Sequence, residues 1–375
     1  MYKNKLEYIW LDNNNNFRSK VKIDSSCIEP SPCCLETWNY DGSSTGQASG
    51  NNSEVFIKPY LVLKDYDNIN DNYYYVFCEC MNPDGTPHKT NTRSSVVDFF
   101  QDENIKKLKP LFGIEQEFFV FKDGKPIVWN DENTEPQGNY YCGNGGKSIH
   151  KYSRRFLDNV IRILGNWSIN ITGYNYEVAP GQMEIQICEE GLLAADYLQV
   201  TRFILTRCAE EMGWDIVLTP KPDILNSDKW NGSGCHVNFS TLDMRESYPD
   251  KPFYNLYKTS EIIRQMALCH EMDIYSFGSE NNMLRLSGKN ETSSFNKFTY
   301  GIANRGSSIR IPRSFVNSLK GYIEDRRPGA DMDPYTVIKI ICSYAIQHKN
   351  CSNLEKDKIR EIMLDIISKH LDEHL

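Results

Sequence analysis

The chain has 375 residues, a length that predicts two domains or three. Its 42 basic and 50 acidic residues give a net charge of −8, which argues against a general nucleic-acid binder, since such proteins present a basic face to phosphates. Hydrophobic residues make up 40% of the chain, enough for a packed core, yet no apolar run approaches the ~20 residues of a membrane span.

The first part of the chain has the pattern of short β-strands separated by polar turns. Residues 1–16 show no signal-peptide pattern, which favours a cytoplasmic location. The turn-rich segment 82–87 marks the expected boundary between a β-rich domain of residues 1–87 and a larger domain of residues 88–375. Strands are expected over residues 6–11, 21–23, 55–58, 60–64 and 73–80.

The larger domain mixes helices with strands, so the expected fold class is α+β. Apolar residues recur at helical spacing over residues 149–164, 193–208 and 359–375. Strands are expected over residues 112–120, 174–178 and 182–188. Twelve cysteines are spread along the chain without a C-x-x-C pair, which predicts reduced, mostly buried thiols rather than a zinc site or a disulfide scaffold.

Four glutamates stand in strand-like segments that are otherwise apolar. Side chains alternate along a strand, so Glu115 and Glu117 project from the same face. A turn at residues 180–181 would place Glu177 and Glu184 on neighbouring strands of a hairpin. Close like charges are unfavourable unless a cation lies between them. Solvated carboxylates on an exposed strand, or an ordinary hairpin with a polar side, would also explain these segments.

A histidine and a group of arginines follow. His236 comes after the glycine-rich segment 230–234, where a histidine is more often structural than a ligand. Five arginines in residues 303–328 could bind carboxylates or phosphates bidentately, although a salt-bridged surface would also account for them. Carboxylate-rich sites select hard divalent cations, and paired cations with arginines are the usual equipment for phosphoryl transfer.

Taken together, these motifs resemble the eukaryotic-type (class II) glutamine synthetases. They occur in the family's order between about residues 36 and 334, and the joint match is far more specific than any one motif. The motifs are Trp38-Asn39-Tyr40-Asp41-Gly42-Ser43-Ser44-Thr45-Gly46-Gln47 and the segments 112–119, 136–143, 177–186, 231–240, 290–292 and 303–328.

The resemblance implies an N-terminal β-grasp domain and a C-terminal glutamine-synthetase catalytic domain, an antiparallel sheet flanked by helices. It implies a homo-oligomeric ring with active sites between neighbouring subunits, expected as a decamer of two pentamers. The implied substrates are L-glutamate, ammonium and ATP, and the implied metal is Mg²⁺ or Mn²⁺. Neither nucleic acid nor a membrane is an implied partner.

The implied reaction is the ligation of ammonia to the side-chain carboxylate of L-glutamate. That carboxylate attacks the γ-phosphoryl group of ATP, giving γ-glutamyl phosphate and ADP, and ammonia then displaces phosphate. Ammonium must first lose a proton, which Asp41 of the adjacent subunit would take. Glu291 would close the site, complete the ammonium pocket and help to keep water from the acyl phosphate.

The other site residues carry over by their place in the motifs. One divalent ion would be held by Glu117, Glu177 and Glu184, and the other by Glu115, His236 and Glu324. Glutamate and the transferred phosphoryl group would meet Asn231, Gly232, Arg285, Arg305 and Arg326. The nucleotide would meet Arg310, Ser240 and Tyr322.

Four positions depart from the family's pattern. Leu284 replaces an arginine and Asn290 a histidine on the substrate side, whereas Met183 and Leu111 replace aromatic residues and concern packing or the nucleotide wall. The last ~25 residues look like an added helix.

Two alternatives stay open: a γ-glutamyl ligase of the same fold that uses another amine, and a non-catalytic structural homologue. Asp41 and Glu291 favour ammonia, because a larger amine needs more room and less carboxylate crowding. The presence of all six expected metal ligands favours catalysis.

Overall fold

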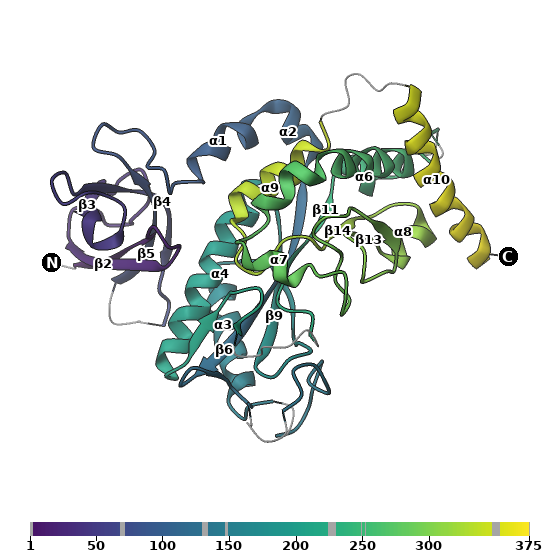
Figure 1. Cartoon of the computed structure of the whole chain (residues 1–375). Helices are drawn as coiled ribbons and strands as arrows, with labels where there is room; N and C mark the ends of the chain where they lie inside the picture. Colours follow the sequence, from purple (N-terminus) through teal and green to yellow (C-terminus); the bar gives the residue numbers. More distant parts are fainter. Residues whose placement is uncertain are drawn as a thin grey trace. The chain divides into compact units, whose positions relative to one another are not determined.

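The computed structural model describes residues 3–67, 72–129, 134–146, 149–223, 230–248, 250–251, 253–346 and 353–374 (Figure 1). The chain divides into two compact units, one of residues 1–98 and 163–168, the other of residues 99–162 and 169–375. The domain boundary expected after residue 87 stays a prediction. Within the described residues, no helix combines the length and the apolarity that a membrane crossing needs.

The smaller unit is built on a five-stranded mixed sheet of order β2-β1-β5-β4-β3. Strands β1 and β5 are parallel, and the other neighbours are antiparallel. The register shifts between Pro59 and Leu61, where proline cannot donate to the ladder, so the two strands expected over residues 55–64 form one irregular strand. The strands are β1 Asn4–Leu11, β2 Phe17–Asp24, β3 Trp38–Asp41, β4 Glu54–Lys64 and β5 Asn72–Met81.

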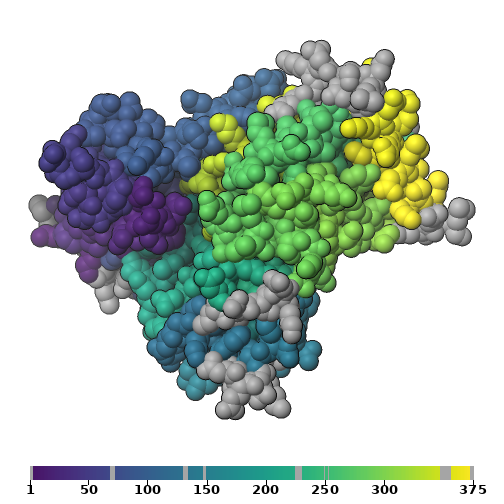
Figure 2. All heavy atoms as spheres, viewed as in Figure 1, coloured from purple at the N-terminus to yellow at the C-terminus, as the bar shows by residue number. Residues whose placement is uncertain are grey.

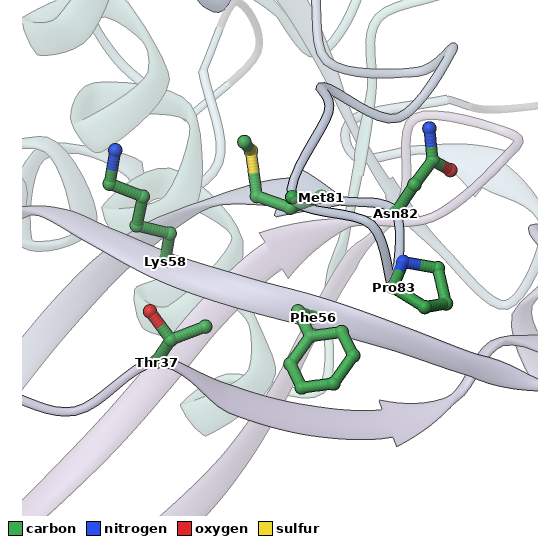
Figure 3. A pocket seen from close by; sticks show the side chains of 7 residues that line it. Thr37, Phe56, Lys58, Met81, Asn82 and Pro83 are labelled. Atoms are coloured by element: carbon green, nitrogen blue, oxygen red, sulfur yellow. The ribbon is translucent and has the colours of Figure 1, made fainter.

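The core of this sheet follows from the alternation of side chains. Leu6 and Tyr8 of β1 pack with Val55 and Ile57 of β4. Phe56 and Lys58 of β4 alternate with these core residues and point to the opposite face of the sheet. They line a pocket beside β3 (Figure 3). Strand β3 ends at Asp41, which begins the 3₁₀ helix η1, Gly42–Thr45.

One expectation about the cysteines is wrong. Cys27 and Cys34, in the loop between β2 and β3, form a disulfide, because the loop brings their Cα atoms to 6.6 Å, within the span of such a bond. Free cysteines are buried at Cys78, Cys80, Cys208, Cys235 and Cys342, as expected, whereas Cys33 and Cys142 are exposed.

The larger unit contains a nine-stranded sheet of order β12-β13-β14-β11-β6-β9-β8, with β7 and β10 also paired to β6. All pairs are antiparallel except β12 and β13. Glu177 and Val178 lie just beyond β8, so that strand ends earlier than expected. The strands are β6 Leu111–Lys122, β7 Lys125–Pro126, β8 Ile171–Tyr176, β9 Gln182–Glu190, β10 Asp215–Val217, β11 Cys235–Ser240, β12 Tyr300–Ile302, β13 Ile309–Ile311 and β14 Ile323–Asp325.

Helices accompany this sheet, which gives the expected α+β fold. Helix α4 packs on β6, β9 and β10, and α10 packs on α6 and α8 (Figure 1). The helix expected over residues 193–208 is confirmed, the one over residues 359–375 is confirmed as far as residue 374, and the last residue lies outside the described ones. The helix expected over residues 149–164 begins later, at Ser153. The helices are α1 Ser94–Gln101, α2 Glu103–Leu108, α3 Ser153–Asn166, α4 Leu192–Glu211, α5 Leu242–Arg245, α6 Tyr254–Asp273, η3 Ile274–Ser276, α7 Asn281–Arg285, α8 Arg313–Ser318, α9 Pro334–Ser343 and α10 Asn353–His374.

The two faces of the central strand β6 carry different kinds of side chain. Phe112, Ile114 and Gln116 alternate along the face toward α4, where the Oε1 of Gln116 accepts a hydrogen bond of 2.7 Å from the Nε of Arg202. The other parity carries the two glutamates of the strand. The sheet therefore presents its carboxylates on the face opposite α4.

Candidate active site

The strand register places the acidic side chains next to one another. Glu117 of β6 lies directly opposite Glu184 of β9, and Glu115 lies opposite His236 of β11. Directly opposed residues share a face with their Cβ atoms ~5 Å apart. Glu324 is on β14, the neighbour of β11, and Glu177 follows β8 at the hairpin turn. Five elements thus converge on one surface.

The six side chains form two groups: Glu117, Glu177 and Glu184, and Glu115, His236 and Glu324. Within each group, one ligand atom per residue lies within 4.8 Å of the others. The Nδ1 of His236 is 3.6 Å from Glu115 and 3.8 Å from Glu117, so it links the groups. The structure brings together the two sets named from the sequence, while ion binding by them stays a prediction.

Neighbouring polar groups orient the carboxylates. Glu117 accepts hydrogen bonds from the backbone amide of Gly234 at 2.7 Å and from the Nε2 of Gln182 at 3.2 Å. Glu184 accepts one of 2.6 Å from Gln186, and Glu115 one of 2.7 Å from Asn238.

These orienting residues were missed as a set by the sequence analysis. Gln182, Gln186 and Asn238 each stand two positions from a predicted ligand, on the same strand face. Polar residues two positions from a predicted ligand were therefore the sequence signal that could have identified these orienting residues.

Burial and mutual repulsion perturb the carboxylates. Burial raises the pKa of Glu177 to about 7 and that of Glu184 to about 8. Burial also raises the pKa of Glu117 well above its ordinary value, and the charges of Glu177 and Glu184 add to the rise. The pKa of His236 is lowered well below its usual range by burial, helped by Arg326, which favours the neutral, metal-binding imidazole. Close carboxylates with raised pKa values fit a site for divalent cations.

We expect the metal-free protein to become less stable as the pH rises from about 5 to about 8. The pKa values of Glu177 and Glu184 rise from 4.5 to about 7 and about 8, so their contribution is complete below 4.5 and is lost as the pH rises through the folded values. Bound cations require deprotonated ligands, so they should reverse the trend. Thermal denaturation in EDTA and in Mg²⁺ across this range measures both effects; a melting temperature in EDTA that is flat or rises would contradict the prediction.

Two arginines flank the histidine-containing group. The Nη1 of Arg310 donates to one oxygen of Glu324 at 2.6 Å, and the Nη1 of Arg326 donates to the other at 2.5 Å. The Nε of Arg326 also donates to the carbonyl of Arg305 at 3.0 Å. The Nε of Arg310 is buried, with no hydrogen-bond partner among the described residues. This site thus pairs its carboxylates with guanidinium groups that can meet phosphate.

Arg285 is buried, and backbone carbonyls accept hydrogen bonds from its guanidinium group. Its Nη2 donates to the carbonyls of Arg326, Arg327 and Pro328 at 2.8 to 3.0 Å. The residue therefore holds the segment that follows β14, and its role in binding substrate stays a prediction.

The segment before β11 contributes a constrained glycine and a buried polar atom. Gly232 has a φ of +77°, and a Cβ there would lie 2.5 Å from the carbonyl of Pro220, so only glycine fits. The Oδ1 of Asn231 is buried and has no hydrogen-bond partner within the described residues. Such an acceptor can receive an ammonium group of a ligand.

The remaining predicted residues lie at several places. Ser240 is buried at the end of β11, where its hydroxyl accepts a hydrogen bond of 2.8 Å from Arg245. Tyr322 is partly exposed, and burial raises the pKa of its phenol, with Glu115 and Glu324 adding to the rise. These positions leave the nucleotide contacts of both residues as predictions.

Glu291 lies in a turn, whereas Asp41 lies where β3 meets η1. Asn290 and Glu291 both have a positive φ, 52° and 61°, and glutamate rarely adopts this conformation, so the loop holds local strain. Asp41 belongs to the smaller unit, where it accepts hydrogen bonds from Ser43 and Ser44 that lower the pKa of its carboxyl.

The departures from the family's pattern fall in two settings. Leu284 is largely exposed on α7, and Asn290 donates to the carbonyl of Trp230 at 3.4 Å. Met183 is buried on β9 with the parity opposite to that of Glu184, so it packs in the core rather than in the site.

Known proteins match this chain over most of its length. The glutamine synthetase catalytic-domain family model matches residues 90–343. A cytosolic glutamine synthetase isozyme of Arabidopsis thaliana is 40% identical, covering 92% of this chain and 94% of the relative. A chloroplastic glutamine synthetase of Zea mays is also 40% identical, covering 91% of this chain and 78% of the relative.

The fold is likewise similar to a solved structure. The cryo-EM structure of Plasmodium falciparum glutamine synthetase has a TM-score of 0.67 and 20% identity, covering 96% of this chain and 72% of that one. At this identity the likeness supports the fold, and the family rests on the closer relatives. The chain therefore belongs to the eukaryotic-type glutamine synthetases, the ligases that make L-glutamine from L-glutamate and ammonia with ATP.

Proposed function

We propose that this chain carries out the glutamine synthetase reaction on the acidic face of its larger sheet, through γ-glutamyl phosphate. The observation that carries the proposal is the convergence of two ligand groups, flanked by Arg310 and Arg326. Phosphoryl transfer needs little covalent help from the protein but does need charge neutralisation and alignment. A surface with two cation sites and adjacent guanidinium groups supplies both.

The donor set favours Mg²⁺ or Mn²⁺, because five of the six ligands are carboxylates. Glu117, Glu177 and Glu184 would hold one ion and Glu115, His236 and Glu324 the other. Ions at these positions would neutralise charge on the phosphates of ATP.

The chain's own groups would align the substrates. The carbonyl oxygen of the Asn231 side chain is available for the amino group of glutamate, and Gly232 lets the backbone approach closely. Arg305 and Arg326, with Arg285 behind them, would hold the substrate carboxylate and the transferred phosphoryl group. Arg310 would meet the nucleotide through its unpaired Nε. Ser240 and Tyr322, which the family motifs also assign to the nucleotide, would complete this binding site.

The second half-reaction needs a base and a closed site. The carboxylate of Asp41 is charged at neutral pH and would attract ammonium, and the approach of the cation to the neighbouring subunit's site would let it take the proton. Glu291 would cover the acyl phosphate, and its strained loop is suited to a change of conformation.

We also propose a cytoplasmic location, like that named for the Arabidopsis relative. For the assembly, we propose a decamer of two pentamers in which Asp41 completes the active site of a neighbouring subunit. Sedimentation velocity of the purified protein tests the assembly. A species other than the decamer under assay conditions would contradict it.

Amine choice tests the function itself. With Mg²⁺, ATP and glutamate, we expect ammonium to stimulate phosphate release at least about a hundredfold more than ethylamine or a polyamine, since carboxylates shaped for NH₄⁺ leave no room for an alkyl group. Phosphate assays at saturating ATP measure this ratio. A protein that ammonium does not stimulate would overturn the assignment.

A further inference from the structure

Helix α10 lies wholly beyond the region matched by the family's catalytic-domain model, which ends at residue 343. Ile359, Ile362 and Ile366 form its buried side, and Ile366 is 0% exposed. Leu364, on another side of the helix, is 58% exposed. The buried side packs against α6 and α8, and the yellow C-terminal atoms in Figure 2 lie against the green ones. The helix is therefore an integral part of the larger unit.

A specific polar contact joins α10 to α8. The Nδ1 of His370 lies 2.7 Å from the carbonyl oxygen of Val316, one of the last four residues of α8. The last four carbonyls of a helix have no intrahelical partner, so this contact satisfies one of them. Phe315 and Val316 are the buried residues of α8, so the helix packs on the larger unit through one face.

The position of α8 determines that of an arginine of the site. Pro312 alone separates α8 from β13, and β13 carries Arg310 at its centre. Two residue pairs of the ladder and the hydrogen bond from Arg310 to Glu324 join β13 to β14, so packing by α8 adds to a short ladder. On the outer side, the edge strand β12 carries Tyr300, whose pKa is raised by burial and by Asp365 and Glu361 of α10.

We propose that α10 is a positioning element: by packing on α8, it holds β13 so that Arg310 meets the nucleotide. The proposal rests on the proposed role of Arg310 in ATP binding. Ile366 and His370 act through α8 and are positioning residues, not catalytic ones. Loosening them should weaken ATP binding more than glutamate binding, because Asn231, Gly232 and Arg326, three of the residues assigned to glutamate, lie outside residues 300–311.

The test compares Ile366→Ala and His370→Ala with the exposed control Leu364→Ala in the assembled full-length enzyme. We expect the first two to raise the KM for ATP about fivefold or more while the KM for glutamate changes less than about twofold, since small misplacements near phosphate have large effects. Hydrogen exchange of residues 300–311 should accelerate in the same variants. His370→Gln, which keeps a donor, should recover part of the loss.

Several outcomes would overturn the proposal. One is a lower melting temperature with unchanged KM for ATP and unchanged exchange in residues 300–311. Another is dissociation of the oligomer with intact kinetics in the remaining assembled fraction, which would make α10 an assembly element. Arg310→Gln separates the role of Arg310 in ATP binding from the positioning role of α10. If this variant leaves the KM for ATP unchanged, the proposed function of Arg310 fails, whereas hydrogen exchange of residues 300–311 still tests whether α10 holds β13. Should Ile366→Ala not fold, His370→Ala and His370→Gln carry the comparison.

Discussion

Replacing Glu117 with alanine is expected to abolish glutamine formation while the protein still folds and assembles. Glu117 belongs to one ligand group and lies 3.8 Å from the histidine of the other, so its loss disturbs both. We expect kcat to fall by about 10³, the upper end of the range for removing one electrostatic contact to a transition state. Folding should survive, because burial and two neighbouring carboxylates disfavour the charged form of this side chain.

The measurement combines three readings on one preparation: γ-glutamyl transfer to ammonia, Mn²⁺ binding by calorimetry, and sedimentation velocity. Glu190→Ala, at the exposed end of β9 in the same sheet, is the matched control and should resemble the parent protein. Activity within tenfold of the parent with Mn²⁺ binding unchanged would remove Glu117 from the metal site.

Asp41→Asn is the second substitution with a large expected effect. Asparagine keeps the shape of the side chain but cannot accept a proton, so kcat with ammonium should fall by about 10² to 10⁴ with little change in the KM for ATP. Asp84→Asn is the control, because Asp84 is an exposed aspartate of the same unit whose pKa is also lowered by a neighbouring hydroxyl, that of Thr86. Steady-state kinetics at saturating glutamate measure the difference.

Mixing the two inactive variants tests where Asp41 acts. If it serves a neighbouring subunit, an equal mixture of Asp41→Asn and Glu117→Ala subunits, reassembled at random, regains about a quarter of the parent activity, since a head-to-tail ring interface creates some sites with both residues intact. No recovery from a reassembled mixture would place Asp41 in the site of its own subunit.

Local patterns predicted the elements of this fold well, and tertiary relations poorly. The period-two spacing of Glu115 and Glu117 correctly put both on one face of a strand. The same rule could not say that β11 and β9 flank that strand, because register between strands distant in sequence depends on packing of the whole sheet. The grouping of the six ligands came from family resemblance, and not from spacing.

Other differences have local physical causes. The bulge at Pro59 left β4 as one strand where a break was expected, since a lost ladder bond bends a strand without ending it. The disulfide of Cys27 and Cys34 depends on the path of an exposed loop, which composition does not encode. Arg285 was named from a motif as a substrate-binding residue, but its guanidinium group donates hydrogen bonds to backbone carbonyls. No sequence pattern reveals such backbone partners.

The alternation along β6 limits how this protein can change in evolution. Gln116 and the two glutamates beside it point to opposite faces, so a one-residue insertion or deletion before them would turn both carboxylates into the core and a neutral amide into the site. Point substitutions could then not repair the strand one at a time, because each would leave a charge buried. Length variation is instead expected to accumulate in surface turns such as residues 82–87, where an added residue shifts no strand.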